Sequence, residues 1–406
     1  MSARDMLRRW LGVTDPVAPA PAAPSQELSR SVHGVSRQLG ELRGLIHQQT
    51  DFTLEALHRA GWQDEEDVAQ QEALQRALSV VRGDGDVIVG PWTGEVGFEL
   101  MYWIPFLAWL VEQGLSSERI VVVSRGGAGL WYRHLTSRYV DILDLLTPDE
   151  FRERTAGKKK QYDPRRDLDK ELVKKTRDRL GLKDVPVVHP SSMFRLFAGL
   201  WRKRAAVELV ESFSRFQPLT RPSSTERPAG LPRDYVVAKF YFSKAFPETT
   251  ANKAFISDMI RAVSRQMPVA LLSTTVRLDE HSDYQSSSGS GVFVVDAHAT
   301  PQKNLETQTE LIAGSRGFVG TYGGFSYLAP FYGVPSLSFF SRRDGFETHH
   351  LDLAHRVFDR LLPGGFLALD RRSAALVDPA VNRWASGQAS ARVEEAPDAE
   401  KAGVTT

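Results

Sequence analysis

The residues best suited to chemistry in this chain lie between Gly317 and Phe340. The stretch reads GFVGTYGGFSYLAPFYGVPSLSFF, the pattern of a strand, a glycine turn, a short helix and a second strand. Gly323 and Gly324 can adopt backbone angles that side chains forbid, and the N–H groups at the start of the helix point back at the turn. The pattern therefore predicts a cradle for a phosphate or diphosphate, built from backbone N–H groups and hydroxyls of Thr321, Tyr322, Gly323, Gly324, Phe325 and Ser326.

A glycine pair before a helix is also a common tight turn that binds nothing, so the neighbouring elements matter. The segment Leu305–Arg316 has the apolar periodicity of a helix and leads into Gly317–Gly320, which reads as a short buried strand. The glycine turn thus follows the carboxyl end of a strand, which is where open α/β sheets bind ligands.

An acidic residue stands between two glycines in the segment Gly94–Gly97, which reads GEVG. A short strand at Val87–Gly90 precedes this segment, and an apolar helix at Phe98–Gln113 follows it. We therefore expect the carboxylate of Glu95 to be presented at the mouth of a parallel sheet.

The composition is that of a globular protein. With 406 residues and 42% hydrophobic content, the chain can build two domains, each with its own core. The net charge of +1 supplies no strong field to attract nucleic acid, so no nucleic-acid partner is expected. The absence of cysteine excludes disulfides, a thiol nucleophile and cysteine metal sites, and it fits a cytoplasmic protein.

The sequence also predicts that the chain does not cross a membrane. No run of about 18 apolar residues occurs, and the Pro/Ala-rich segment after Leu11 lacks the apolar core of a signal peptide. The opening Met6–Leu11 combines charged and apolar residues, so a disordered tail or a peripheral contact with the inner face of the membrane through Trp10 is expected.

Composition changes along the chain predict its organisation. Proline-rich residues break all periodicity at 218–232, where we place a linker between two α/β domains, because strands alternate with helices on either side. The predicted parts are a disordered N-terminal segment at 1–26, a helical region at 27–80, α/β domains at 84–217 and 233–376, and a disordered tail at 377–406.

Apolar residues in the helical region follow a heptad pattern. Their spacing alternates between four and three residues, as in the seam of a coiled coil. The residues are Leu28, Val32, Val35, Leu39, Leu42 and Ile46. This pattern predicts either a homo-oligomer formed through the Leu28–Ile46 helix or the packing of that helix on its own catalytic domain.

The organisation of the chain resembles that of bacterial glycosyltransferases of the GT-B architecture, including the heptosyltransferase and surface-polysaccharide groups. The segments that carry the resemblance are Gly90–Leu100, Trp103–Leu107 and Gly317–Phe340, and the likeness extends from Asp86 to Arg360. The resemblance implies two Rossmann-like parallel-sheet domains that face a cleft. It further implies transfer of a sugar from a nucleotide-diphosphate donor to a glycan or lipid-linked acceptor, with the nucleotide sugar as co-substrate and no cofactor.

In such an enzyme an acidic residue in the first loop takes the proton of the acceptor hydroxyl, so the resemblance makes Glu95 the candidate general base. The open alternative is that Glu95 only caps the following helix. Glu99, one turn further, is the competing carboxylate, although the alternative of a polar contact to neighbouring turns is stronger for Glu99 than the capping alternative is for Glu95. Gly94, Gly97 and Trp92 belong to the same predicted substrate site, with Trp92 either a core residue or a surface on which a sugar stacks.

The second domain is expected to hold the donor. Lys244 lies beyond the end of a predicted strand at Tyr235–Phe242, where a lysine can neutralise a leaving diphosphate, whereas Lys239 lies within that strand. A surface lysine is the alternative for Lys244. The resemblance places Glu306 near the nucleotide base or ribose, and a solvated helix start is the alternative there.

No metal site is expected. His349 and His350 are adjacent, whereas a metal pair on a helix needs a spacing of three or four residues. Asp84 and Asp86 match an acidic metal motif but precede a strand instead of following one. Other enzymes of the same architecture stay open, namely a polysaccharide pyruvyl transferase or a nucleotide-sugar epimerase, as does a non-catalytic coiled-coil adaptor that binds a glycan or nucleotide.

Overall fold

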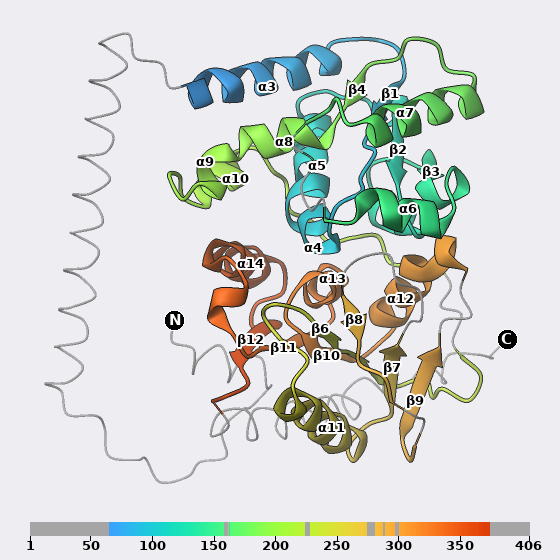
Figure 1. Ribbon diagram of the computed structural model, residues 1–406, viewed down its shortest axis with the longest axis vertical. Coiled ribbons are helices and arrows are strands. Elements are labelled where there is room, and N and C mark those ends of the chain that lie inside the picture. The colour runs from blue at the N-terminus through green and yellow to red at the C-terminus, as the bar shows by residue number, and fades with distance from the viewer. Residues whose placement is uncertain are drawn as a thin grey trace, which may run out of the picture. The chain divides into compact units, whose positions relative to one another are not determined.

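Two parallel β-sheets organise the chain (Figure 1). This computed structural model describes residues 65–157, 161, 163–223, 228–273, 281–286, 289–296 and 300–373. The predicted segments at 1–26 and 377–406 and the heptad seam from Leu28 to Ile46 lie outside the described residues. Both sheets belong to one compact unit that includes the described chain from Ala73 onward. The predicted α/β fold class with two parallel sheets is therefore confirmed.

The first sheet has four strands in the order β3-β2-β1-β4, and each neighbouring pair is parallel. Its strands are β1 (Val87–Val89), β2 (Ile120–Ser124), β3 (Tyr139–Asp141) and β4 (Val187–Val188). β1 lies inside the sheet, where its uninterrupted apolar run VIV is buried on both faces.

One helix precedes the first sheet in the chain, and the other helices of this part lie between its strands or after its last strand. They are α3 (Glu65–Val81), α4 (Val96–Phe98), the π-helix η1 (Glu99–Trp103), α5 (Ile104–Glu112), α6 (Pro148–Thr155), α7 (Asp167–Leu180), α8 (Pro190–Leu196), α9 (Ala198–Trp201) and α10 (Glu208–Ser212). Short 3-10 turns are η2 (Ser117–Arg119), η3 (Ala128–Tyr132) and η4 (Ile142–Asp144).

The second sheet has six strands in the order β12-β11-β10-β5-β7-β9, again with parallel neighbours. They are β5 (Val236–Lys239), β7 (Val269–Ser273), β9 (Val292–Asp296), β10 (Gly317–Thr321), β11 (Ser336–Phe340) and β12 (Phe366–Asp370). A separate antiparallel pair joins β6 (Tyr241–Phe242) to β8 (Ser282–Asp283). The helices are α11 (Thr250–Ser264), α12 (Asn304–Ala313), α13 (Gly324–Phe331) and α14 (Thr348–Leu361), with 3-10 turns η5 (Pro301–Lys303) and η6 (Arg343–Gly345).

In each sheet the chain changes the side on which it adds strands. β2 and β3 lie on one side of β1 and β4 on the other, while β7 and β9 lie on one side of β5 and β10 to β12 on the other. The crevice at the carboxyl ends of the strands beside such a change is where open α/β sheets bind ligands. The loop after β1 and the turn after β10 both lie at such a place.

Two predicted elements differ in detail from those observed. The strand expected at Tyr235–Phe242 is divided into β5 and β6. The Tyr241 N–H donates to Thr321 Oγ1 (3.0 Å), and the Thr321 hydroxyl donates to the Tyr241 carbonyl (2.9 Å). These side-chain bonds replace the ladder partner of β5 and leave β6 to pair with β8. The apolar helix expected at Phe98–Gln113 begins at Val96 and includes the wide π-helical turn η1.

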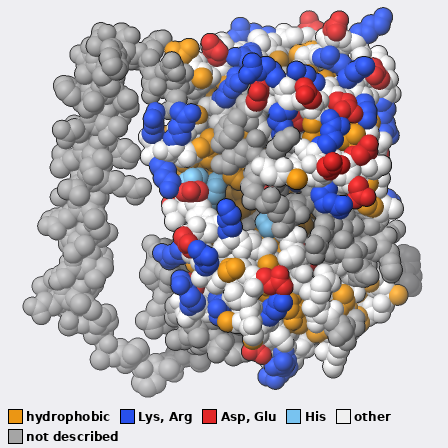
Figure 2. All heavy atoms as spheres, viewed as in Figure 1, with side chains coloured by type: hydrophobic (Ala, Val, Ile, Leu, Met, Phe, Trp, Pro, Cys, Tyr) orange, Lys and Arg blue, Asp and Glu red, His pale blue; other side chains and the backbone are white. Residues whose placement is uncertain are grey.

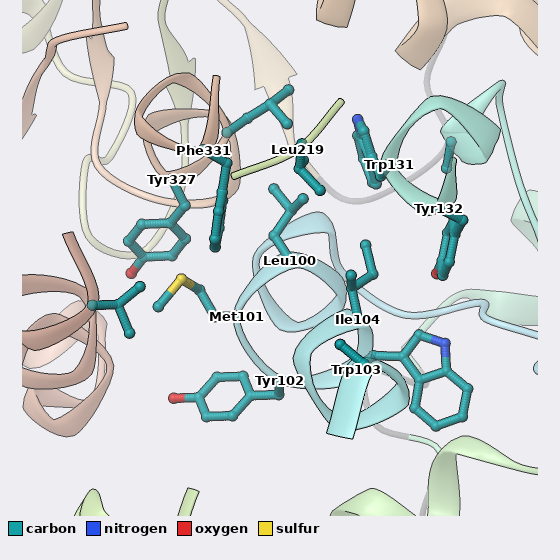
Figure 3. Close-up of a cluster of buried hydrophobic side chains, with 14 of the residues drawn as sticks. Leu100, Met101, Tyr102, Trp103, Ile104, Trp131, Tyr132, Leu219, Tyr327 and Phe331 are labelled. Atoms are coloured by element: carbon teal, nitrogen blue, oxygen red, sulfur yellow. The ribbon is translucent and has the colours of Figure 1, made fainter. Parts of the chain in front are cut away.

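A shared hydrophobic core joins helices that belong to the two sheets. Figure 3 shows Leu100 and Met101 of η1 beside Tyr327 and Phe331 of α13. Each large side chain that leaves water contributes roughly 1.5–3 kcal/mol, so several such contacts hold these helices together firmly. A polar bond supplements them, because the Trp131 indole N–H donates to Thr309 Oγ1 at 2.9 Å.

His134 lies beside this core and gives the fold a sensitivity to acid. Both ring nitrogens are buried without a hydrogen-bond partner among the described residues, and burial lowers the pKa of His134 to about 4. Between pH 6.5 and 4 the unfolded chain binds a proton at this residue that the folded chain excludes, so stability falls as pH falls through that window. We expect a loss of about 2 kcal/mol at pH 4.5 from this residue alone, because one pKa unit corresponds to about 1.4 kcal/mol and the side chain is partly exposed.

Urea unfolding of the natural protein and of the variant His134→Leu, at pH 7 and at pH 4.5, measures this contribution. The variant should lose less stability than the natural protein between the two pH values. An equal loss in both proteins would assign the acid sensitivity to other groups.

Charged side chains of both signs are interspersed over the face of the molecule that Figure 2 shows. This agrees with the net charge of +1 and indicates no broad basic surface on that face. Within the described ranges, no helix combines the length and the apolar character needed to cross a bilayer.

Candidate active site

A cavity of about 760 Å³ is lined by residues that follow strands of both sheets. Its volume lies within the roughly 300–1,000 Å³ of most small-molecule sites. The loop after β1, the end of β5 and the turn after β10 all contribute to its walls. The predicted site residues that line it are Gly94, Glu95, Gly97, Lys244, Tyr322, Gly323, Gly324 and Phe325.

The glycine turn after β10 is required by the protein's own close packing. Gly323 has a φ of 148°, and a Cβ atom on it would lie 2.0 Å from the Tyr241 hydroxyl oxygen. A Cβ atom on Gly324 would lie 2.8 Å from the backbone nitrogen of Gly97. The two glycine segments therefore meet directly, and α13 begins beside the loop that carries Glu95. This close approach explains both glycines whether or not a ligand contacts them.

Glu95 occupies the N-cap position of α4, yet its side chain makes no capping hydrogen bond. Its backbone is extended, with φ −72° and ψ 148°, and its partly exposed side chain lines the cavity. The capping interpretation of Glu95 therefore lacks the bond that would support it. Among the described residues no ion-pair partner is recorded for this carboxylate, which leaves it available to a ligand.

Glu99 is fully buried and holds several donors from the neighbouring strand and turn. It accepts hydrogen bonds from Ser124 Oγ (2.6 Å), the Tyr132 hydroxyl (2.6 Å) and Arg125 Nη1 (2.9 Å). Burial raises the pKa of the Glu99 carboxyl, whereas Arg125 and the two hydroxyls favour its charged form. Glu99 thus contacts β2 and η3 instead of the neighbouring turns of its own helix, and it does not line the cavity.

The side chains of the π-helical turn η1 point in different directions. Glu99 points to the Ser124 and Tyr132 hydroxyls, while Met101 and Tyr102 line the cavity. A π-helical turn holds more residues than an α-helical turn, and such turns are frequent at functional sites. Here the wide turn lets one short segment serve both the packing of the first sheet and the cavity wall.

Basic residues outnumber acidic ones along the cavity wall. Among the described residues the basic side chains are Arg125, Arg152, Lys239 and Lys244, and the carboxylates are Glu95 and Asp283. Lys239 is buried and paired with Asp283, with Nζ and Oδ2 2.6 Å apart. Lys244 is exposed, and no carboxylate of the described chain lies within ion-pair distance of it. Arg125 is paired with Glu99 and Arg152 with Asp149, so Lys244 is the cation of the described cavity wall that is left for a ligand.

Some predicted site residues do not line the cavity, because other contacts bury or occupy them. Trp92 is buried and stacks on Trp103 and Phe194, with ring centroids 5.8 and 6.1 Å away. Thr321 is occupied by the backbone of Tyr241, as described above.

Ser326 and Glu306 also lie away from the cavity wall. Ser326 Oγ accepts from the Gly323 N–H (3.1 Å) and donates to the Gly323 carbonyl (2.7 Å), so it fixes the turn from behind. Glu306 packs against the turn at Gly127, where its Cβ would be 2.8 Å from a Cβ added to that glycine. Their predicted contacts with a substrate stay predictions.

The cavity also contains residues that were not predicted to belong to a substrate site. The Tyr102 hydroxyl of η1 and Nδ1 of His350 at the start of α14 are 2.5 Å apart, which joins helices of the two sheets at the cavity wall. Arg125 follows β2 just as Glu95 follows β1, so its position after a strand was a usable signal. Asp283 follows no recognisable pattern, because its strand β8 is only two residues long.

The described residues contain no cluster of three or more His, Asp or Glu side chains arranged to hold a metal ion. Independence from metal ions stays a prediction. What the described arrangement can do chemically is to present the Glu95 carboxylate and the Lys244 ammonium group to one ligand.

Comparison with known proteins gives similarity to solved structures alone. No protein-family model matches the chain, and no curated protein sequence matches it. It is similar to the ADP-heptose LPS heptosyltransferase II of E. coli, with 11% identity and a TM-score of 0.39 over 77% of this chain and 99% of that one. It is also similar to TibC, an iron-containing dodecameric glycosyltransferase from enterotoxigenic E. coli, with 12% identity and a TM-score of 0.36 over 65% of this chain and 61% of that one.

A third similar structure is the glycosyltransferase SnogD from Streptomyces nogalater, with 11% identity and a TM-score of 0.32 over 77% of this chain and 96% of that one. A likeness at this level leaves the function of the chain to be argued from its own residues.

Proposed function

We propose that this chain is a glycosyltransferase that moves a sugar from a nucleotide-diphosphate donor to a glycan or lipid-linked acceptor. The observation that carries the proposal is that one cavity contains both a carboxylate and a cation suited to this reaction. The carboxylate of Glu95 and the ammonium group of Lys244 line the same cavity, and neither has an ion-pair partner among the described residues. Glu95 lies in the loop after β1, at an edge where open α/β sheets bind ligands, and Lys244 lies in the loop after the short strand β6.

The proposed reaction assigns each group a step. The acceptor oxygen attacks the anomeric carbon of the donor sugar, and its proton passes to Glu95, which acts as general base. The bond between that carbon and the diphosphate oxygen breaks, and its electron pair leaves with the nucleoside diphosphate. Lys244 then lies where it can stabilise the negative charge that grows on the leaving group.

The backbone N–H groups at the start of α13 are proposed as further contacts of the diphosphate. They follow Gly323 and Gly324 at the cavity wall, and the first turn of a helix carries free N–H groups and a partial positive charge. Ser326 and Thr321 would act behind this turn, by holding its backbone in place.

Nucleotide binding tests the donor part of the proposal directly. Thermal shifts with UDP, GDP, ADP, CMP and dTDP, each with and without EDTA, should show a rise in Tm that is selective for one nucleotide, because a ligand of the folded state raises apparent stability. A selective rise that survives EDTA supports a metal-independent donor site. No rise with any nucleotide would contradict the proposal.

Replacing Lys244 should weaken this binding. We expect Lys244→Met to raise the Kd of the selected nucleoside diphosphate about 10-fold, which corresponds to the loss of one charge-assisted contact. Lys253→Met is the matched control, since Lys253 is also an exposed lysine but does not line the cavity. Isothermal titration calorimetry measures both. Equal affinities for the natural protein and Lys244→Met would remove Lys244 from the donor site.

A further inference from the structure

We infer that Arg125, held in place by Glu99, is a positioning residue that fixes the loop bearing Glu95. The inference rests on the proposed function, because it assigns Arg125 a role in presenting the base. Arg125 acts through the backbone of this loop.

Adjacent strands bring Arg125 to the loop. β1 and β2 are parallel neighbours with Val89 opposite Val122, so the segments that follow them leave the same edge of the sheet. Arg125 follows β2 directly, and its Nη2 donates to the carbonyl oxygen of Gly94. Gly94 immediately precedes Glu95 in the chain, so this bond fixes the peptide at the base of the Glu95 residue.

Glu99 forms hydrogen bonds both with Arg125 and with the loop that carries Glu95. Its carboxylate accepts from Arg125 Nη1 at 2.9 Å, and its own backbone N–H donates to the Glu95 carbonyl at 3.2 Å. The carbonyl groups of Gly94 and Glu95 are therefore both held, one by the guanidinium and one by the first residue of η1. The Glu95 side chain takes part in neither bond and is left at the cavity wall.

The surroundings of the pair make this clamp stiff. Glu99 is fully buried, and Arg125 is 6% exposed, so neither side chain can exchange its partner for bulk water easily. Ser124 and Tyr132 donate to the second oxygen of Glu99 and fix the plane of its carboxylate. Arg125 donates to Glu99 through Nη1 and to the Gly94 carbonyl through Nη2. Holding both acceptors at once needs the planar guanidinium group, which a lysine does not provide.

Such a clamp matters because a general base acts only within a narrow range of positions. A displacement of about 1 Å can reduce turnover about 100-fold. A residue that acts only by positioning Glu95 must lose its influence when Glu95 can no longer accept a proton. This dependence separates positioning from direct contact with the substrate.

The test is a double-mutant cycle of Arg125→Met and Glu95→Gln. The readout is kcat for release of nucleoside diphosphate from the UDP-, GDP-, ADP- or dTDP-hexose that carries the nucleotide selected by the binding screen. We expect Arg125→Met to lower kcat about 30-fold when Glu95 is present and less than about 3-fold in the Glu95→Gln protein. The KM of the nucleotide sugar should change little in both backgrounds. Arg125→Lys should restore only part of the loss.

Arg138→Met is the matched control. It removes an arginine that pairs with a carboxylate, Asp86, outside the cavity, and it keeps the bonds of Arg125 to Glu99 and Gly94, so kcat should stay within about 2-fold of the natural value. Should Arg125→Met fail to fold, the double variant Glu99→Gln/Arg125→Met takes its place in the cycle, because it removes both buried charges together.

Two results are distinguishable from each other. An equal fall in kcat from Arg125→Met in both backgrounds would overturn the inference, since Arg125 would then act independently of Glu95. Full turnover of the Glu95→Gln protein would instead overturn the role of Glu95 in the proposed function. A fall confined to the Glu95 background supports both.

Discussion

Glu95→Gln is expected to lower turnover by about 10²- to 10⁴-fold while leaving nucleotide binding and Tm nearly unchanged. The substitution keeps the size of the side chain and removes its capacity to accept a proton. Because Glu95 makes no capping bond and no recorded ion pair within the described chain, the fold loses no interaction with it. Steady-state release of nucleoside diphosphate measures turnover, and calorimetry measures nucleotide affinity.

The control for this prediction is Glu118→Gln, which makes the same change at an exposed carboxylate outside the cavity. It should leave turnover within about 2-fold of the natural value, as most surface substitutions leave stability and structure little changed. A Glu95→Gln protein with full turnover would show that another group takes the proton. A Glu95→Gln protein that no longer binds the nucleotide would assign Glu95 to donor binding instead of proton transfer.

The largest loss of stability is expected from Glu99→Ala, at about 3–5 kcal/mol of unfolding free energy. The substitution leaves the Arg125 guanidinium buried without its counter-charge and deprives Ser124 and Tyr132 of their acceptor. An unpaired buried charge is far more costly than the loss of a single neutral hydrogen bond, which costs about 1 kcal/mol.

Urea denaturation followed by circular dichroism gives the free energy of unfolding of each variant. Tyr132→Phe removes only one neutral donor from the same carboxylate and should cost about 1 kcal/mol. If Glu99→Ala costs no more than Tyr132→Phe, water must reach Arg125 in the variant and replace the lost carboxylate.

Local patterns in the sequence were sufficient for the framework of the molecule. Uninterrupted apolar runs such as Val87–Val89 predict buried parallel strands, and Gly323 and Gly324 mark the turn after β10. Because ligands bind at the carboxyl ends of such strands, the same patterns placed Glu95 and the glycine turn at what is now a shared cavity.

The side-chain network behind Glu95 could not be predicted in the same way. It depends on the register between β1 and β2, which brings Arg125 to the carbonyl of Gly94 from 31 residues away. The pairing of Lys239 with Asp283 likewise spans 44 residues and depends on the separate two-stranded pair of β6 and β8. Periodicity describes one segment at a time and carries no information on such long-range partners.

For Trp92 and for Glu99 the sequence left two interpretations open, and the structure was needed to choose between them. Trp92 lies beside the Glu95 loop in the sequence, where a core residue and a platform for a sugar have the same pattern. Its stacking on Trp103 and Phe194 gives it a place in the core. Glu99 has an acidic side chain one turn into an apolar helix, and only its three donors explain why it is buried there.

The π-helical turn at Glu99–Trp103 limits how the length of this segment can vary. A π-helical turn closes i→i+5 hydrogen bonds and therefore holds about one residue more than an α-helical turn. Deleting one residue from η1 to restore an α-helical turn would leave the Glu95 loop and α5 in nearly their present orientation, but the turn would present one side chain fewer. The shortened turn would lose either a side chain that packs on the first sheet, as Glu99 does, or one that lines the cavity, as Met101 and Tyr102 do, so homologous proteins should preserve the number of residues in this turn.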